Sequence, residues 1–257
     1  MTTPLNDLFA LTDRVAVVTG GASGIGAGIT TVLAEAGATV VIADRDREGA
    51  EREATALTDA GLKAIATAVD VADENSVITA CADIVATVGV PWLLVNNAAV
   101  QDRELLLDTT AGEWDRINTV NARGAFLMTR ELARSMVARG EGGRIVNIAS
   151  NALRGGVVKG LAAYTASKGA VAALSLMSAF ELAEHSITVN TVLPGAVITP
   201  GAVAAKGPMT PGPATRQTPF GFQEPREIGA AVLFFASLAA RPITNQVLAV
   251  DGGFSIS

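Results

Sequence analysis

The stretch Arg14-Val-Ala-Val-Val-Thr-Gly-Gly-Ala-Ser-Gly-Ile-Gly26 passes from a short apolar run into a turn that contains four glycines. Residues 14–19 are typical of a buried strand, and the amphipathic residues 24–36, which stop at Gly37, are typical of a helix. The glycines between them let the backbone approach a pyrophosphate, and the helix N-terminus offers free N–H groups and a positive dipole end. The stretch therefore predicts a strand, a phosphate-binding turn and a helix in succession.

The alternation of strand and helix continues to the end of the chain. Such alternation implies right-handed βαβ units, and 257 residues suit one α/β domain. We expect a Rossmann-like, doubly wound, seven-stranded parallel sheet with helices on both faces, in a single domain of residues 1–257. The further strands are expected at 38–43, 63–70, 91–95, 143–149, 187–193 and 246–250, and the further helices at 46–60, 73–87, 111–138, 161–184 and 225–239.

Composition and charge exclude several classes of function. The net charge is −6 without a basic cluster, which argues against a nucleic-acid partner. No apolar run approaches the roughly 20 residues of a membrane span, and residues 1–11 lack the pattern of a signal peptide. The single Cys81 rules out an intrachain disulfide and suits a reducing compartment. We expect a cytoplasmic protein that binds neither membranes nor nucleic acid.

The chain has one histidine, His185, and one cysteine. Together they cannot build the zinc site of a zinc-dependent alcohol dehydrogenase, so no metal is expected. A Ser-His-Asp hydrolase would need His185, which instead falls at a predicted turn between helix and strand. We therefore interpret His185 as a structural residue.

Tyr164 is the only tyrosine, and Lys168 follows it by one turn of the predicted helix 161–184. A free phenol has a pKa of about 10 and is nearly inert as a base at neutral pH. A nearby ammonium favours the phenolate, so the pair could exchange a proton with a substrate oxygen. Taken alone, the pair favours a boundary tyrosine beside a solvated lysine, because structural pairs of this kind are common.

Asp44 ends the second predicted strand, 18 residues after Gly26. A carboxylate at this position accepts hydrogen bonds from the adenosine ribose and repels a 2′-phosphate, which favours NAD over NADP. Arg45 follows directly and leaves acceptance of NADP open.

Five motifs in this order resemble the short-chain dehydrogenase/reductase family, in its compact single-domain branch. They are Thr19-Gly-(three residues)-Gly-Ile-Gly26, Asn96-Asn97-Ala98-Ala99, Ser150, Tyr164-(three residues)-Lys168 and Pro194-Gly195, and the resemblance extends from about residue 11 to 254.

The resemblance implies roles for four residues in catalysis. Tyr164 matches the acid/base, and Lys168 the lysine that lowers its pKa and holds the nicotinamide ribose. Ser150 matches the serine that hydrogen-bonds the substrate oxygen, and Asn121 the asparagine that holds a water in the proton relay. Ser150 lies one residue further from Tyr164 than is common, and Asn151 occupies the strict spacing. The strand pattern Ile-Val-Asn-Ile-Ala-Ser nevertheless aligns Ser150, with one extra residue in the loop 151–160.

The resemblance also implies bound NAD and a homotetramer built on the two long helices and the C-terminal strand region. The residues implied to hold the cofactor are Gly20, Ser23, Gly24, Ile25, Gly26, Asp44, Asp70, Val71, Asn97, Ala98, Tyr164, Lys168, Pro194, Gly195, Val197 and Thr199. Two small departures from the family pattern, Ala99 and Asn245 at usual glycine positions, leave the catalytic pair untouched.

The expected substrate pocket draws on residues 100–103, 151–160 and a substrate loop at about 196–224. These stretches contain Arg103, Arg154 and Lys159, so an acidic substrate is conceivable, although exposed cations on loops are usually solvated. The expected function is an NAD(H)-dependent oxidoreductase that interconverts a small or medium secondary alcohol and a ketone. Two alternatives stay open: an NADPH-dependent 3-oxoacyl-carrier-protein-type reductase, and a catalytically silent nucleotide-sensing protein on the same fold.

Overall fold

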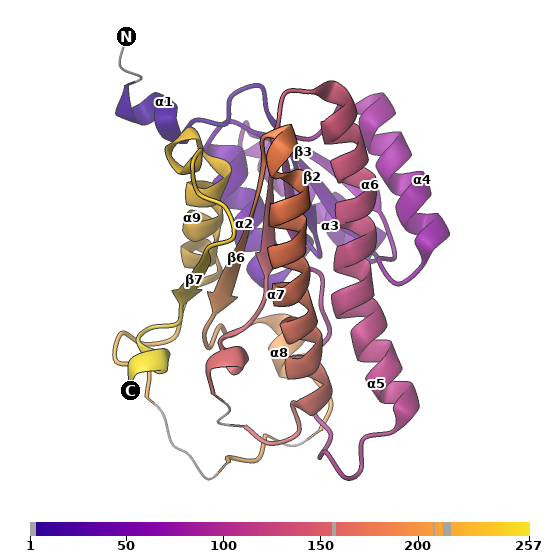
Figure 1. Ribbon diagram of the computed structural model, residues 1–257, viewed down its shortest axis with the longest axis vertical. Coiled ribbons are helices and arrows are strands. Elements are labelled where there is room, and N and C mark those ends of the chain that lie inside the picture. The colour runs from indigo at the N-terminus through magenta and orange to yellow at the C-terminus, as the bar shows by residue number, and fades with distance from the viewer. Residues whose placement is uncertain (1–3, 156–157, 208, 213–216) are drawn as a thin grey trace.

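The computed structural model describes residues 4–155, 158–207, 209–212 and 217–257 (Figure 1). Its centre is a seven-stranded sheet of order β3-β2-β1-β4-β5-β6-β7 in which every paired strand is parallel. The predicted doubly wound sheet is thereby confirmed. The strands are β1 Val15–Thr19, β2 Thr39–Asp44, β3 Lys63–Ala68, β4 Leu93–Asn96, β5 Gly143–Ile148, β6 Ile187–Pro194 and β7 Val247–Val250.

Helices cover both faces of the sheet. One apolar core joins the sheet to α2 (Gly24–Glu35), α3 (Arg47–Asp59) and α9 (Pro225–Ala236). The other joins it to α4 (Glu74–Thr87), α6 (Gly124–Arg139) and α7 (Ala162–Leu182). The inner strands of the sheet pack between two helical layers, so their sequences are largely apolar rather than alternating, whereas the edge strands β3 and β7 are partly exposed.

Three predicted segments differ from the structure. The single helix expected at 111–138 is α5 (Ala111–Asn118) and α6, joined by a π-helical turn, Thr119–Arg123. The loop expected at 196–224 contains a short helix, α8 (Pro200–Ala204), which Thr199 caps through its hydroxyl. A further short helix, α1 (Leu5–Phe9), precedes β1. Residues 156–157 of the predicted loop 151–160, and residues 208 and 213–216 of the predicted substrate loop, lie outside the described part.

The chain reverses its direction of progress across the sheet between β1 and β4. It runs outward from β1 through β2 to β3, and then crosses back to place β4 on the other side of β1. Ligands of open α/β sheets bind at such a switch point, outside the carboxyl ends of the strands. The fold therefore predicts a ligand-binding site at the carboxyl ends of β1, β2 and β4.

Candidate active site

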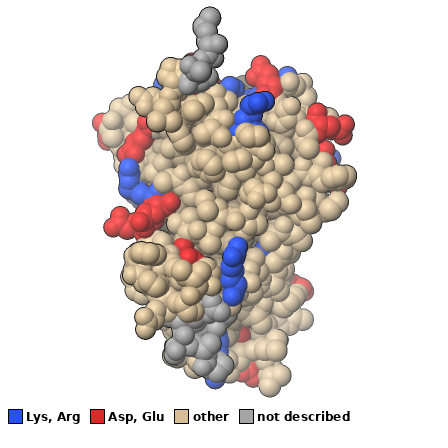
Figure 2. Space-filling view, turned by 60° about the vertical axis from the view of Figure 1, so that its left-hand side comes forward, with Lys and Arg blue, Asp and Glu red and all other residues tan. Residues whose placement is uncertain are grey.

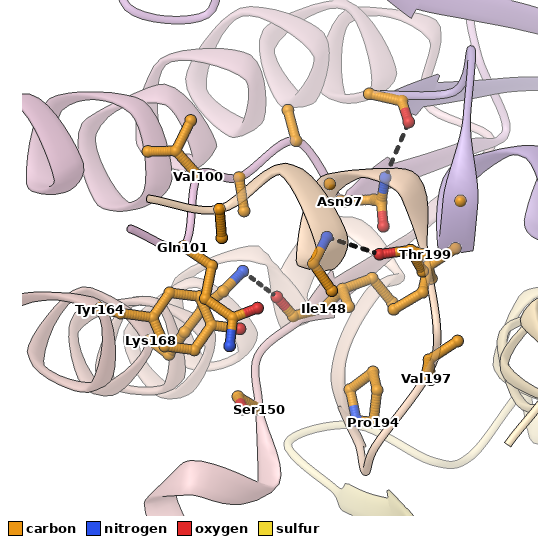
Figure 3. Close-up of a pocket in the computed structure, with 18 of the residues that line it drawn as sticks. Asn97, Val100, Gln101, Ile148, Ser150, Tyr164, Lys168, Pro194, Val197 and Thr199 are labelled. Carbon is orange, nitrogen blue, oxygen red and sulfur yellow. Dashed lines mark hydrogen bonds between the residues drawn. The ribbon is translucent and has the colours of Figure 1, made fainter. Parts of the chain in front are cut away.

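A cavity of about 670 Å³ lies at the carboxyl ends of the strands. Every residue predicted to hold the cofactor lines it, together with Ser150 (Figure 3). Residues far apart in the chain, from Gly20 to Thr199, thus share one pocket. His185 lies at the opposite end of the sheet, in the turn Ala183–His185 that precedes β6, away from this pocket.

The glycine-rich turn is closed too tightly to accept side chains at key positions. A Cβ atom on Gly26 would lie 2.0 Å from the carbonyl oxygen of Gly20, and Gly20 itself has a φ of +64°. The Asn97 amide donates to the carbonyls of Thr19 and Gly20, at 2.9 and 3.0 Å, and so ties the turn to the end of β4. The result is a bare backbone cradle at the N-terminus of α2, which fits a pyrophosphate.

Asp44 is held at the end of β2 by two backbone N–H groups. Ala22 N donates to its Oδ2 at 3.1 Å, and Asp46 N donates to its Oδ1 at 3.0 Å. Each carboxylate oxygen retains a lone pair that can accept a ribose hydroxyl. Arg45 lines the same pocket.

Tyr164, Lys168 and Ser150 come together where the start of α7 meets the end of β5 (Figure 3). All three are buried, and the Ser150 hydroxyl is near enough to the Tyr164 phenol to affect its pKa. Lys168 Nζ lies 5.8 Å from the centroid of the Tyr164 ring and donates to the Ile148 carbonyl at 2.8 Å. Figure 3 shows the three side chains facing the same cavity.

Burial is the largest influence on the pKa of both Tyr164 and Lys168. It raises the pKa of the Tyr164 phenol, and the Ser150 hydroxyl offsets part of that increase. It lowers the pKa of Lys168 to about 8, so the ammonium is still the main form at pH 7. The expected lowering of the Tyr164 pKa by Lys168 stays a prediction.

The lowered pKa of Lys168 predicts a pH-dependent contribution to stability. Above about pH 8 the folded lysine loses its proton, whereas the unfolded lysine keeps it up to its ordinary value of 10.5. The unfolded state then binds more protons, so the lysine's contribution to the free energy of unfolding rises with pH. Relative to Lys168→Met, the wild type should gain on the order of 2 kcal/mol between pH 8 and about pH 9.5.

Urea unfolding of both proteins across this range measures the difference. Burial also raises the pKa of Cys81, to about 12, which lowers stability over the same pH range. Because Cys81 is present in both proteins, its effect cancels in the difference. A difference that stays level with pH would contradict the assigned burial of a charged lysine.

Asn121 is the one predicted site residue that does not line the cavity. It lies in the π-helical turn, almost wholly buried. Its Oδ1 accepts from Val100 N at 2.8 Å, and its Nδ2 donates to the Val100 carbonyl and to Ser167 Oγ at 3.0 and 2.9 Å. The side chain therefore positions the pocket segment that begins at Val100, and its role in a water relay stays a prediction.

Several residues that line the pocket were not predicted from the sequence. Arg116 of α5, Val120 and Phe254 line the cavity, although none belongs to a motif. Of the cations expected near the substrate, Arg154 and Lys159 are exposed and lie outside the lining. No local signal could have identified Arg116, because its place depends on how α5 packs beside the cavity.

Comparison with known proteins matches this fold and pocket. A family model described as enoyl-(acyl carrier protein) reductase matches residues 20–255. The chain is 38% identical to a cis-4-hydroxycyclohexanecarboxylate dehydrogenase of Sinomonas cyclohexanicum, over 96% of this chain and 98% of that one. It is 34% identical to an NAD-dependent glycerol dehydrogenase of Listeria innocua, over 96% of each.

A solved gluconate 5-dehydrogenase of Burkholderia cenocepacia, in complex with NADP and tartrate, superposes with a TM-score of 0.89. It is 32% identical, and the match covers 99% of this chain and 100% of that one. The protein belongs to the short-chain dehydrogenase/reductase family. None of the described helices is both long and apolar enough to cross a membrane.

Proposed function

We propose that the protein is an NAD-dependent oxidoreductase that interconverts a secondary alcohol and a ketone, with Tyr164 as the acid/base. The observation that carries the proposal is that Tyr164 and Ser150 line the same cavity as the glycine-rich turn. The names of the relatives, which describe dehydrogenases of small alcohols, support the same class of reaction. We place all of these functions in one domain, with residues 196–224 as its substrate loop.

The chain's own residues would position the substrate and move one proton. A bound nicotinamide supplies the chemistry that accepts or delivers the hydride. Ser150 would hold the substrate oxygen beside the Tyr164 hydroxyl, which takes the alcohol proton in oxidation and returns it in reduction. The burial of both groups keeps bulk water from this oxygen. Lys168, fixed by the Ile148 carbonyl, would donate to the hydroxyls of the nicotinamide ribose.

Preference for NAD is proposed from the placement of Asp44. Two backbone N–H groups hold its carboxylate at the pocket wall, where a 2′-phosphate would meet a fixed negative charge. Arg45 lines the wall as well, and one solved relative binds NADP, so NADP is tested as a second cofactor.

A panel of secondary alcohols and ketones, assayed with NAD(H) and NADP(H) by nicotinamide absorbance, tests this function. We expect turnover of small alcohols and their ketones, with the higher kcat/KM for NAD(H). Faster turnover of a 3-oxoacyl thioester with NADPH would favour the acyl-carrier-protein reductase instead. NADH binding without turnover of any substrate would favour the silent nucleotide-sensing protein.

We propose that the protein is a homotetramer, as the family resemblance implies, and that it is cytoplasmic. Exposed apolar side chains support the association of subunits. Three apolar side chains of α7, Leu176, Met177 and Phe180, are exposed, as is Phe126 of α6. On the side where β7 lies in Figure 1, Figure 2 shows a broad area above the middle without charged side chains. Burial of such apolar surface drives subunit association, and light scattering would give the mass. The buried, free Cys81 suits a reducing compartment.

A further inference from the structure

Three charged side chains in and beside the cavity, those of Arg103, Asp102 and Arg116, are engaged within the protein. Arg103 Nε donates to the Gly207 carbonyl at 3.2 Å, and its Nη2 donates to the Ala205 carbonyl at 2.9 Å. Its backbone N–H bonds the carbonyl of Lys206 at 2.8 Å. Arg103 therefore clamps the arm of the substrate loop that follows α8, and it is not directed at a substrate anion.

The neighbouring Asp102 is engaged in the same way. Its Oδ1 accepts from the Lys206 backbone N–H at 2.7 Å, and its Oδ2 accepts from Arg116 Nη2. Arg116 also donates to both carboxylate oxygens of Glu113. The two acids and one guanidinium form a closed ion-pair cluster at the edge of the cavity.

Lys206 is the remaining cation at this end of the described lining, apart from the buried Lys168. It is exposed. The hydrogen bond from Arg116 lowers the pKa of Glu113, and the Lys206 ammonium adds a smaller decrease. The two carboxylates and the two cations have a net formal charge of zero, so this wall carries no excess positive charge for a substrate carboxylate.

Gln101 differs from these neighbours because its amide is left free. It is half-buried, and its side chain makes no hydrogen bond to any other described residue. In Figure 3 it points into the pocket on the side of Tyr164. Its position is set by Val100, whose backbone Asn121 holds at both N–H and carbonyl. A carboxamide both donates and accepts, which matches a neutral hydroxyl or carbonyl.

The other walls near Tyr164 are small and apolar, with Val100, Ala152, Val158, Leu161 and Ala202 among the lining residues. An ionised carboxylate placed among them would lose its hydration without gaining a cation, and such desolvation is costly. A neutral alcohol with a second oxygen would instead lose little, because the Gln101 amide can replace the water that this oxygen gives up.

We propose that the substrate is a small neutral secondary alcohol with a second oxygen, and that Gln101 is the residue that recognises this oxygen. The proposal rests on the dehydrogenase function proposed above. It selects between two classes of substrate that the names of the relatives leave open, neutral polyols and hydroxy acids.

The test compares cyclohexanol, the 1,2- and 1,4-cyclohexanediols and cis-4-hydroxycyclohexanecarboxylate with NAD. For the wild type, we expect kcat/KM for the better diol to exceed that for the carboxylate by about tenfold or more. Gln101→Leu should lower kcat/KM for that diol about 3- to 10-fold and for cyclohexanol less than about twofold, because one neutral hydrogen bond is lost. Gln101→Lys should raise kcat/KM for the carboxylate.

Gln246→Leu, an exposed glutamine outside the cavity, is the matched control and should leave all four values unchanged. An unchanged NADH dissociation constant shows that the Gln101 variants are folded. Equal losses on the diol and on cyclohexanol would overturn the role of Gln101. A preference for the carboxylate that Lys206→Met abolishes would overturn the neutral substrate class. Absence of turnover on every substrate and cofactor would instead overturn the dehydrogenase function itself.

Discussion

Tyr164→Phe is expected to lower kcat by about 10³-fold or more while NADH binding survives. The substitution removes one hydroxyl, and with it the group that faces both Ser150 and the cavity. No second tyrosine and no histidine lines the pocket to take its place. The phenylalanine ring fits the buried site, so the fold and the cofactor cradle should be unaffected.

The measurement is steady-state turnover of the best alcohol, with the NADH dissociation constant from fluorescence titration. Ser150→Ala serves as a comparison and should lose less, about 10- to 100-fold, because it removes a hydrogen bond to the substrate oxygen rather than the proton carrier. Turnover within tenfold of wild type in Tyr164→Phe would disprove the assignment of the acid/base.

Asp44→Ala is expected to lower kcat/KM for NADH about 100-fold and to raise that for NADPH, so that the preference for NAD is lost or reversed. Charge-assisted hydrogen bonds contribute roughly 1.5–3 kcal/mol each, and the carboxylate offers an acceptor to each ribose hydroxyl. The same change removes the charge that opposes a 2′-phosphate, and it leaves Arg45 at the pocket wall to attract one.

Asp44→Asn separates charge from hydrogen bonding, because the amide keeps one acceptor oxygen without the negative charge. It should fall between wild type and Asp44→Ala for NADH. Asp59→Ala, at the exposed far end of α3, is the matched control for loss of a carboxylate and should change neither cofactor's kcat/KM. A wild type that prefers NADPH would show that Arg45 outweighs Asp44.

The sheet was predictable because parallel strands are buried on both faces. Each strand therefore reads as a short apolar run, and glycines or polar residues mark the ends, as at Thr19 and Gly37. Segments with weaker local signals were missed. The five residues of α1 and of α8 are too few to show a helical period, and the π-helical turn at Asn121 has the same composition as the helices it joins.

The candidate site was predictable where its chemistry depends on neighbours in sequence. Tyr164 and Lys168 are one helical turn apart, and the glycines of the turn are contiguous with β1, so the motifs that carry the family resemblance could be recognised in the sequence. The direction of the pKa shift of Tyr164 was not predictable in this way. Its largest cause is burial, which depends on segments from across the chain.

The amino-acid sequence by itself determined the order of strands and helices, the phosphate-binding turn and the identity of the reactive side chains, because these follow from local periodicity and residue chemistry. Tertiary structure alone decided that Arg103 clamps the substrate loop and that Arg116 pairs with both Asp102 and Glu113. Contacts such as that of Arg103 with Gly207 join residues about 100 positions apart. Only the packed chain brings them within hydrogen-bonding distance, and so decides which polar group remains free to meet a substrate.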